Sequence, residues 1–146
     1  MKKIWLLIFI TLVFAIPAFF LGKVIWSDNP TMPMPTSGQL PFFIFLSIVE
    51  SLTFGLGVSF AIFGYSLVKK VSQKLKLKVT LSYISIIWLL VSWWPHDNLH
   101  RVNGMNMQGL LYIEYGFHLT LIIASLILAY TFISILKGIK IVPVRK

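Results

Sequence analysis

The chain has no cysteine and very few acidic residues. It contains 146 residues with 13 Lys and Arg, but only 4 Asp and Glu. The missing cysteine excludes disulfide bonds, thiolate nucleophiles, iron–sulfur clusters and thiolate metal ligands. Any bound metal ion must therefore be held by imidazole, carboxylate, thioether or backbone groups.

Charged residues of both signs are scarce. They make up 12% of the chain, whereas 58% is hydrophobic, and soluble domains carry about 25% charged residues. This composition predicts an all-α integral membrane protein. The formal net charge of +9 does not indicate nucleic-acid binding, because the basic residues cluster at the ends of apolar runs and form no basic face with interleaved aromatics.

Four apolar runs predict a four-helix transmembrane bundle that forms one domain over residues 1–146. The expected helices cover about 4–25, 41–68, 79–100 and 110–136, because a span needs about 20 apolar residues. No A-x-A cleavage pattern follows the first run, so we expect that helix to be retained. Pro95 predicts a kink or a break in the third helix. On the second helix, Ser51, Gly55 and Ser59 form a row of small residues of the kind found where membrane helices approach closely.

The distribution of basic residues predicts the orientation. Two lie at the amino end, five in residues 69–78 and four in the tail, whereas the other two connections carry only Lys23 and Arg101. By the positive-inside rule, both termini and the lysine-rich loop are cytoplasmic and the protein lies in the cell membrane.

Ionisable residues gather between residues 93 and 118. This stretch contains all three histidines of the chain. They belong to two pairs of ionisable residues at i, i+4 spacing, His96 with His100 and Glu114 with His118. On a helix, residues at this spacing lie on the same face. Counting about 1.5 Å per residue from the basic ends places both pairs and Glu50 at a similar depth near the extracytoplasmic edge. The predicted metal ligands are His96, His100, His118, Glu114 and Glu50. Asp97 is a further candidate, although an Asp close behind a proline is more typical of a helix cap or turn.

Imidazoles with carboxylates suit copper, zinc or non-haem iron and fit calcium or magnesium poorly. We favour copper, because Met32, Met34, Met105 and Met107 are expected in the two loops above the site and thioethers select Cu(I). The same methionines could simply pack the loops, and the histidines and carboxylates could form a hydrogen-bonded network without metal. The leading hypothesis is a metal-binding small or accessory subunit of a membrane redox complex, with other membrane subunits or further copies of itself as partners.

Two other functions remain open. One is a membrane enzyme acting on a lipid-like substrate, in which Glu50 and Glu114 are the candidate catalytic residues and a histidine assists in acid–base or metal-assisted chemistry. The other is a proton or cation pathway. No ionisable residue continues the cluster toward the cytoplasmic side, so a pathway would depend on the serines Ser82, Ser85 and Ser125.

Overall fold

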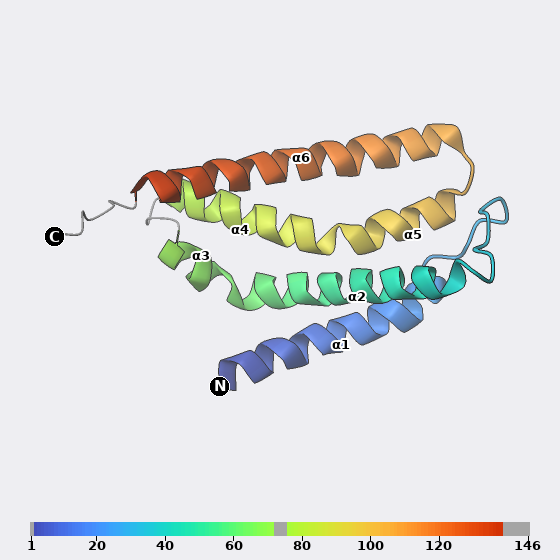
Figure 1. Cartoon of the computed structure of the whole chain (residues 1–146), viewed down its shortest axis with the longest axis horizontal. Helices are drawn as coiled ribbons and strands as arrows, with labels where there is room; N and C mark the ends of the chain where they lie inside the picture. The colour runs from blue at the N-terminus through green and yellow to red at the C-terminus, as the bar shows by residue number, and fades with distance from the viewer. Residues whose placement is uncertain (1, 72–75, 139–146) are drawn as a thin grey trace, which may run out of the picture.

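The computed structural model describes residues 2–71 and 76–138, and every secondary-structure element within these ranges is a helix. Figure 1 shows the helices running back and forth along one long axis. Residues 72–75 of the lysine-rich segment and the basic tail from residue 139 lie outside the described ranges. The helices are α1 (Lys2–Ile25), α2 (Leu40–Phe63), α3 (Tyr65–Val71), α4 (Lys76–Val91), α5 (Trp93–Asn103) and α6 (Met107–Gly138).

Three helices are long and apolar enough to cross a membrane. The candidate spans are Ile4–Ile25, Leu40–Phe63 and Met107–Lys137, and α4 with α5 forms a fourth if this bent pair is taken as one span. The predicted all-helical class is confirmed, and the structure has three or four candidate membrane-spanning helices where the sequence predicts four.

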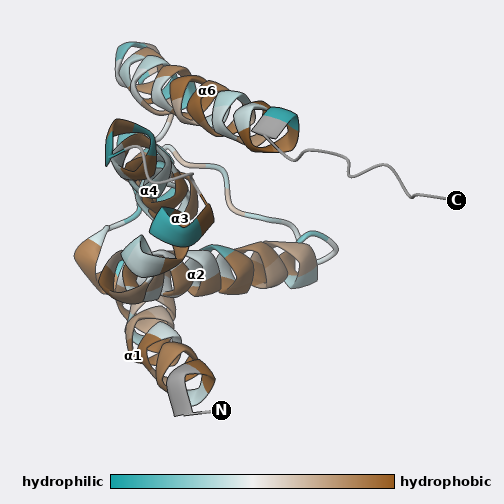
Figure 2. Ribbon diagram, turned by 90° about the vertical axis from the view of Figure 1, so that its left-hand side faces the viewer, coloured by the Kyte–Doolittle hydropathy of each residue, from teal (hydrophilic) through white to brown (hydrophobic). Residues whose placement is uncertain are grey.

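The helices lie side by side in chain order. α1 packs on α2, α2 packs on α4 and α5, and α4 and α5 pack on α6. In the view along the helices, α1 and α6 occupy opposite edges of this row, and many residues of α1, α2 and α6 are hydrophobic (Figure 2). α5 is therefore an inner element with neighbours on two sides.

Small residues allow α1 and α2 to approach closely. Ser51, Gly55 and Ser59 are buried on α2, as the sequence pattern predicts. A Cβ atom at Gly55 would lie 2.3 Å from the Thr11 carbonyl oxygen, so only glycine fits at this crossing. The Ser59 hydroxyl donates a 3.2 Å hydrogen bond to the Leu7 carbonyl oxygen.

The third predicted span bends by 44° at Ser92, between α4 and α5. The bend precedes Pro95, where the sequence predicts a kink or break, by three residues. Proline has no N–H to donate to the carbonyl of residue i−4, here Val91, and its ring crowds that carbonyl. Helical hydrogen bonding resumes at once, because the His96 amide donates to the Ser92 carbonyl at 3.0 Å. Both histidines of α5 therefore lie on a helix that continues to Asn103.

The second predicted helix, 41–68, is also divided. α2 ends at Phe63 and α3 begins at Tyr65, with Gly64 between them. The Phe60 ring fills the space beside Gly64, 2.6 Å from the position of a Cβ atom. Glycine also favours helix less than alanine by about 1 kcal/mol, which makes this position a natural interruption.

Candidate functional site

Helix α5 carries polar side chains on two faces. His96 and His100, one turn apart, lie near α6, since His100 contacts Glu114 of that helix. On the other face, the Trp94 indole N–H donates a 3.2 Å hydrogen bond to the Ala18 carbonyl oxygen of α1. The i, i+4 repeat thus produces one polar face toward α6 and another toward α1 and α2.

The face toward α6 forms a compact cluster of histidine and glutamate. The Nε2 atom of His100 lies 3.2 Å from Nε2 of His96 and 3.2 Å from Oε1 of Glu114. One ligand atom from each of these three residues lies within 4.8 Å of the other two. Glu114 Oε2 is 2.5 Å from Nδ1 of His118, so this carboxylate joins both predicted pairs.

His118 lies beside this three-residue set and not within it. It contacts the second oxygen of Glu114, and its imidazole ring centroid is 5.2 Å from that of His96. Its side chain is 49% exposed, whereas that of His100 is 22% exposed. His118 is therefore placed to orient Glu114 from the outer side of the cluster.

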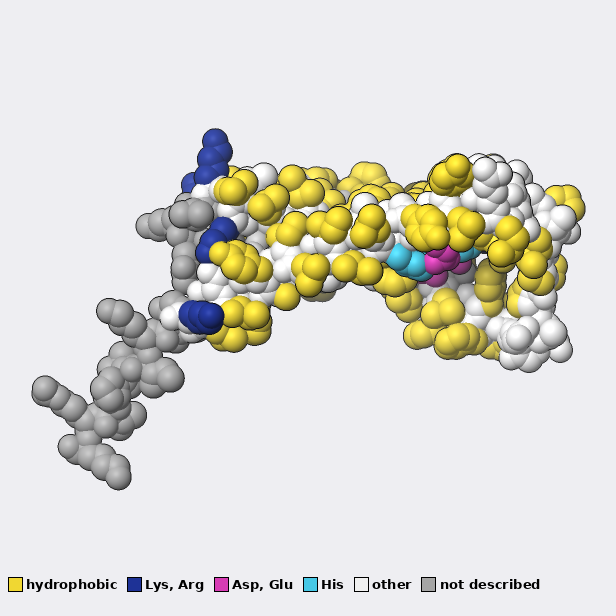
Figure 3. Space-filling view, turned by 90° about the horizontal axis from the view of Figure 1, so that it is seen from above, with side chains coloured by type: hydrophobic (Ala, Val, Ile, Leu, Met, Phe, Trp, Pro, Cys, Tyr) yellow, Lys and Arg dark blue, Asp and Glu magenta, His cyan; other side chains and the backbone are white. Residues whose placement is uncertain are grey.

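Aromatic side chains surround His96. The ring of Phe117 lies 5.2 Å from the imidazole and that of Trp93 lies 6.3 Å away, both edge-on. Phe117 in turn stacks on Trp88. These contacts restrict the ring of His96. Figure 3 shows the histidine and acidic side chains together as one patch on a largely hydrophobic face.

The structure places Glu50 and Asp97 away from this cluster. Both line a cavity of about 320 Å³ between α1, α2 and α5, together with Asn98 and Arg101. Asp97 follows His96 directly in the chain, but a step of one residue on a helix turns the side chain by about 100°. Of the six predicted ligands, His96, His100, Glu114 and His118 therefore lie on the side of α5 that faces α6. Glu50 and Asp97 lie on the side that faces α1 and α2.

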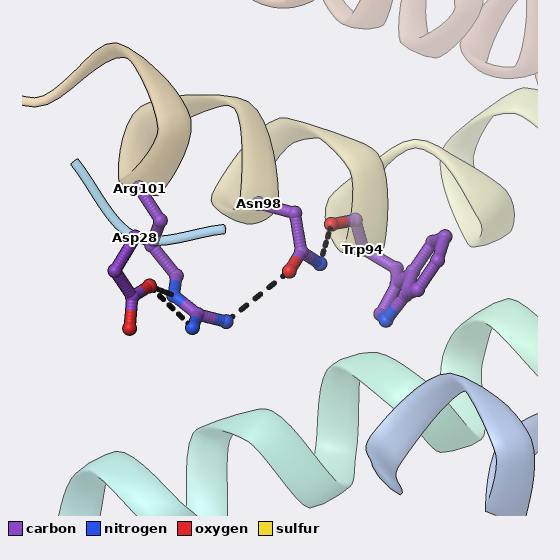
Figure 4. A network of polar contacts seen from close by, with 4 residues as sticks. All are labelled: Asp28, Trp94, Asn98 and Arg101. Carbon is purple, nitrogen blue, oxygen red and sulfur yellow. Dashed lines mark hydrogen bonds and ion pairs between the residues drawn. The ribbon is translucent and has the colours of Figure 1, made fainter. Parts of the chain in front are cut away.

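Sequence reasoning missed an ion pair on the second face of α5. Arg101 Nε donates a 2.8 Å hydrogen bond to Asp28 Oδ1, and a terminal nitrogen of the same guanidinium donates to that oxygen at 2.5 Å. The guanidinium also donates to Asn98 Oδ1 at 3.2 Å, and the Asn98 amide donates to the Trp94 carbonyl (Figure 4). Asp28 belongs to the loop between α1 and α2, so this network joins that loop to α5.

The same loop caps the carboxyl end of α5. The Asn29 amide donates to the Arg101 carbonyl at 2.9 Å, and the Asn29 side chain donates to the Val102 carbonyl at 3.1 Å. These bonds satisfy carbonyls that a helix end leaves without a partner. One signal in the sequence could have indicated this contact, since Asp28 and Arg101 are isolated opposite charges in the two connections that contain few basic residues.

The two faces differ in what they can do chemically. Two imidazole nitrogens and one carboxylate oxygen form the donor set of several metal sites that keep an open coordination position. The cavity on the other face combines carboxylates and cations with apolar walls, which suits a small amphiphile.

Comparison with protein-family models, curated proteins and solved structures finds no match for this chain.

Proposed function

We propose that this chain is an integral membrane protein that binds a transition metal ion through His96, His100 and Glu114. The observation that supports this most directly is the convergence of three ligand atoms within 4.8 Å from two separate helices. A tetrahedral ion with bonds of about 2.0–2.1 Å separates its ligand atoms by about 3.3 Å. The 3.2 Å distances from His100 to His96 and to Glu114 are close to that separation.

The three ligand side chains restrict the bound ion to transition metals. Two imidazoles and a carboxylate bind zinc, divalent copper or ferrous iron and leave room for water or a substrate. Copper is the first candidate, followed by zinc and iron. Met105 and Met107 are exposed at the end of the molecule where α6 begins. Met107 precedes Glu114 by seven residues, or about 10 Å along a helix, which suits a role in metal entry and not in direct ligation.

The site opens sideways, which fits a subunit of a larger membrane complex. The Glu114 side chain is 39% exposed and that of His118 is 49% exposed. Neighbouring residues of α6, including Tyr115 and Leu119, expose apolar surface. Ionisable side chains at lipid-facing positions are costly, so a second membrane subunit beside α6 would complete the site and exclude lipid from it.

Metal binding can be measured on the full chain purified in mild detergent. We expect about one equivalent of copper, zinc or iron by elemental analysis, and stoichiometric rebinding after chelation. His100→Ala removes the ligand atom that lies between the other two and should weaken binding by more than about 100-fold. His118→Ala, which removes the partner of a ligand, should weaken binding by about 10- to 100-fold.

Asp97→Asn and Glu50→Gln are the matched controls. Both residues line the cavity on the other side of α5, so both variants should bind metal like the wild type. Equal losses in Glu50→Gln and His100→Ala would contradict the proposed ligand set. A wild-type protein that binds none of the three metals at micromolar concentration would overturn the proposal altogether.

A further inference from the structure

We infer that the cavity between α1, α2 and α5 binds the headgroup of a zwitterionic phospholipid, one with a primary ammonium and a phosphate. The cavity has a volume of about 320 Å³ and lies on the face of α5 away from the histidines. Small-molecule sites typically start at about 300 Å³. This inference does not depend on the metal proposal.

The cavity collects charges of both signs. The basic residues of the chain gather at residues 2–3, 69–78 and 137–146, apart from Lys23 and Arg101. Both of these line the cavity, as do Glu50 and Asp97. A site that presents two carboxyl groups beside two cations can bind a ligand that itself carries a cation and an anion.

These charges are only partly used within the protein. Arg101 pairs with Asp28 and bonds Asn98 through three of its five N–H groups, which leaves two donors. Among the described residues, Lys23, Glu50 and Asp97 form no ion pair within 4.0 Å. Carboxylates held in a partly enclosed, apolar-walled space gain most from a cationic partner that also donates hydrogen bonds.

The walls fit the chain of a lipid. Phe19, Phe43 and Ile44 line the cavity, as do Phe20 and Leu40. Phe20 is 70% exposed and Leu40 is 45% exposed, so apolar side chains continue from the cavity to the surface of the molecule. In a bilayer this surface faces acyl chains, while Lys23 and Arg101 lie near helix ends, at the level where headgroups reside.

The carboxyl groups of the cavity distinguish between headgroups. A primary ammonium can donate three hydrogen bonds to Glu50 and Asp97, whereas a trimethylated ammonium donates none. A headgroup that carries only a negative charge can still approach Lys23 and Arg101, but it offers no ammonium to Glu50 and Asp97. We therefore expect the order ethanolamine, then choline, then glycerol phospholipids.

The test is native mass spectrometry of the full chain in detergent, titrated with phosphatidylethanolamine, phosphatidylcholine and phosphatidylglycerol of identical acyl chains. The wild type should retain the ethanolamine lipid about tenfold better than the glycerol lipid, which corresponds to about 1.4 kcal/mol. The isosteric double variant Glu50→Gln/Asp97→Asn should reduce this preference to less than about twofold. Lys23→Gln should lower the retention of all three lipids, because each carries a phosphate.

Glu114→Gln is the matched control, since it removes a carboxylate on the opposite face of α5 and should leave lipid retention unchanged. Circular dichroism verifies folding, and the two single variants replace the double variant if the latter loses helicity. Competition with free phosphoethanolamine distinguishes a site for the headgroup alone from one that also needs the acyl chain. An unchanged preference in the folded Glu50 and Asp97 variants, or no lipid retained by the wild type, would overturn the inference.

Discussion

At the scale of single residues, Gly104 determines how the two loops at one end of the molecule fit together. It has a φ of +57° and closes α5 before the turn to α6. A Cβ atom there would lie 2.3 Å from the Thr31 hydroxyl and 2.7 Å from Asn29 Cγ. The Thr31 hydroxyl also accepts a hydrogen bond from the Met105 amide, so the loop between α1 and α2 and the turn before α6 share this contact.

Gly104→Ala should therefore lower the free energy of unfolding by about 1–3 kcal/mol, through backbone strain and steric overlap. Thermal unfolding in detergent, followed by circular dichroism, measures the effect. Gly116→Ala is the matched control, because no heavy atom other than its chain neighbours and the backbone of its own helix lies within 4 Å of a Cβ atom at that position. It should be neutral or slightly stabilising, and equal effects of the two substitutions would contradict this account.

The ion pair between Asp28 and Arg101 is a second feature at the scale of single residues. The Arg101 side chain is only 11% exposed and that of Asp28 is 35% exposed. Asp28→Asn keeps the shape but leaves a largely buried guanidinium without its carboxylate, which should cost about 2 kcal/mol. Limited proteolysis between residues 26 and 39 should become faster as the loop detaches. Asp97→Asn, which removes a carboxylate without an ion pair among the described residues, should leave the cleavage rate unchanged.

At the scale of elements, the bend between α4 and α5 directs His96 and His100 toward α6. Pro95→Ala restores the N–H that can bond to the Val91 carbonyl, so we expect the bend to straighten. Spin labels can be attached at Leu81→Cys and Val102→Cys, both at exposed positions. Straightening would increase the distance between these two positions on the helix axis by about 2 Å, from about 29 Å to about 31 Å. Because the chain has no cysteine of its own, the labels attach only at the introduced sites.

Pro41→Ala provides the comparison for this measurement. Pro41 lies in the first turn of α2, where proline is compatible with a straight helix. The label distance should stay at its wild-type value in this variant. A bend that persists in Pro95→Ala would assign its origin to packing around the buried Ser92 and not to the proline.

At the scale of the whole molecule, α6 lies at one edge of the row of described helices. α6 packs on α4 and α5, and an ion held by His96, His100 and Glu114 would fasten α5 to α6. Metal present at about 100 times its dissociation constant should add about 2.7 kcal/mol to stability. Chelation should therefore lower the midpoint of thermal unfolding and increase hydrogen exchange in residues 107–118, with little change in α1.

Glu114→Gln offers the control for chelation. This variant lacks the carboxylate ligand, so a chelator should no longer change its midpoint. A chelator that destabilises the variant as much as the wild type would show that it acts elsewhere in the protein.

Sequence patterns predict the features that depend on local spacing. Hydropathy identifies the candidate spans, and the i, i+4 pairs place His96 near His100 and Glu114 near His118 within each helix. The rotation of one helix against another is not encoded in such spacing. Counting depth places Glu50 level with the histidines, but depth along a helix does not say which side of α5 a residue of α2 meets. The pairing of Asp28 with Arg101 joins residues 73 positions apart, and loop docking of this kind has no periodic signal.

Helix α5 is short, spans 11 residues and presents different chemistry on opposite sides. A rigid helix cannot turn one of its faces without turning the other. Rotation of α5 about its own axis would move His96 and His100 relative to α6 and, by the same angle, Asp97 and Arg101 relative to α1 and α2. Because the two faces turn together, one rotation angle of α5 sets both its packing on α2 and its packing on α6.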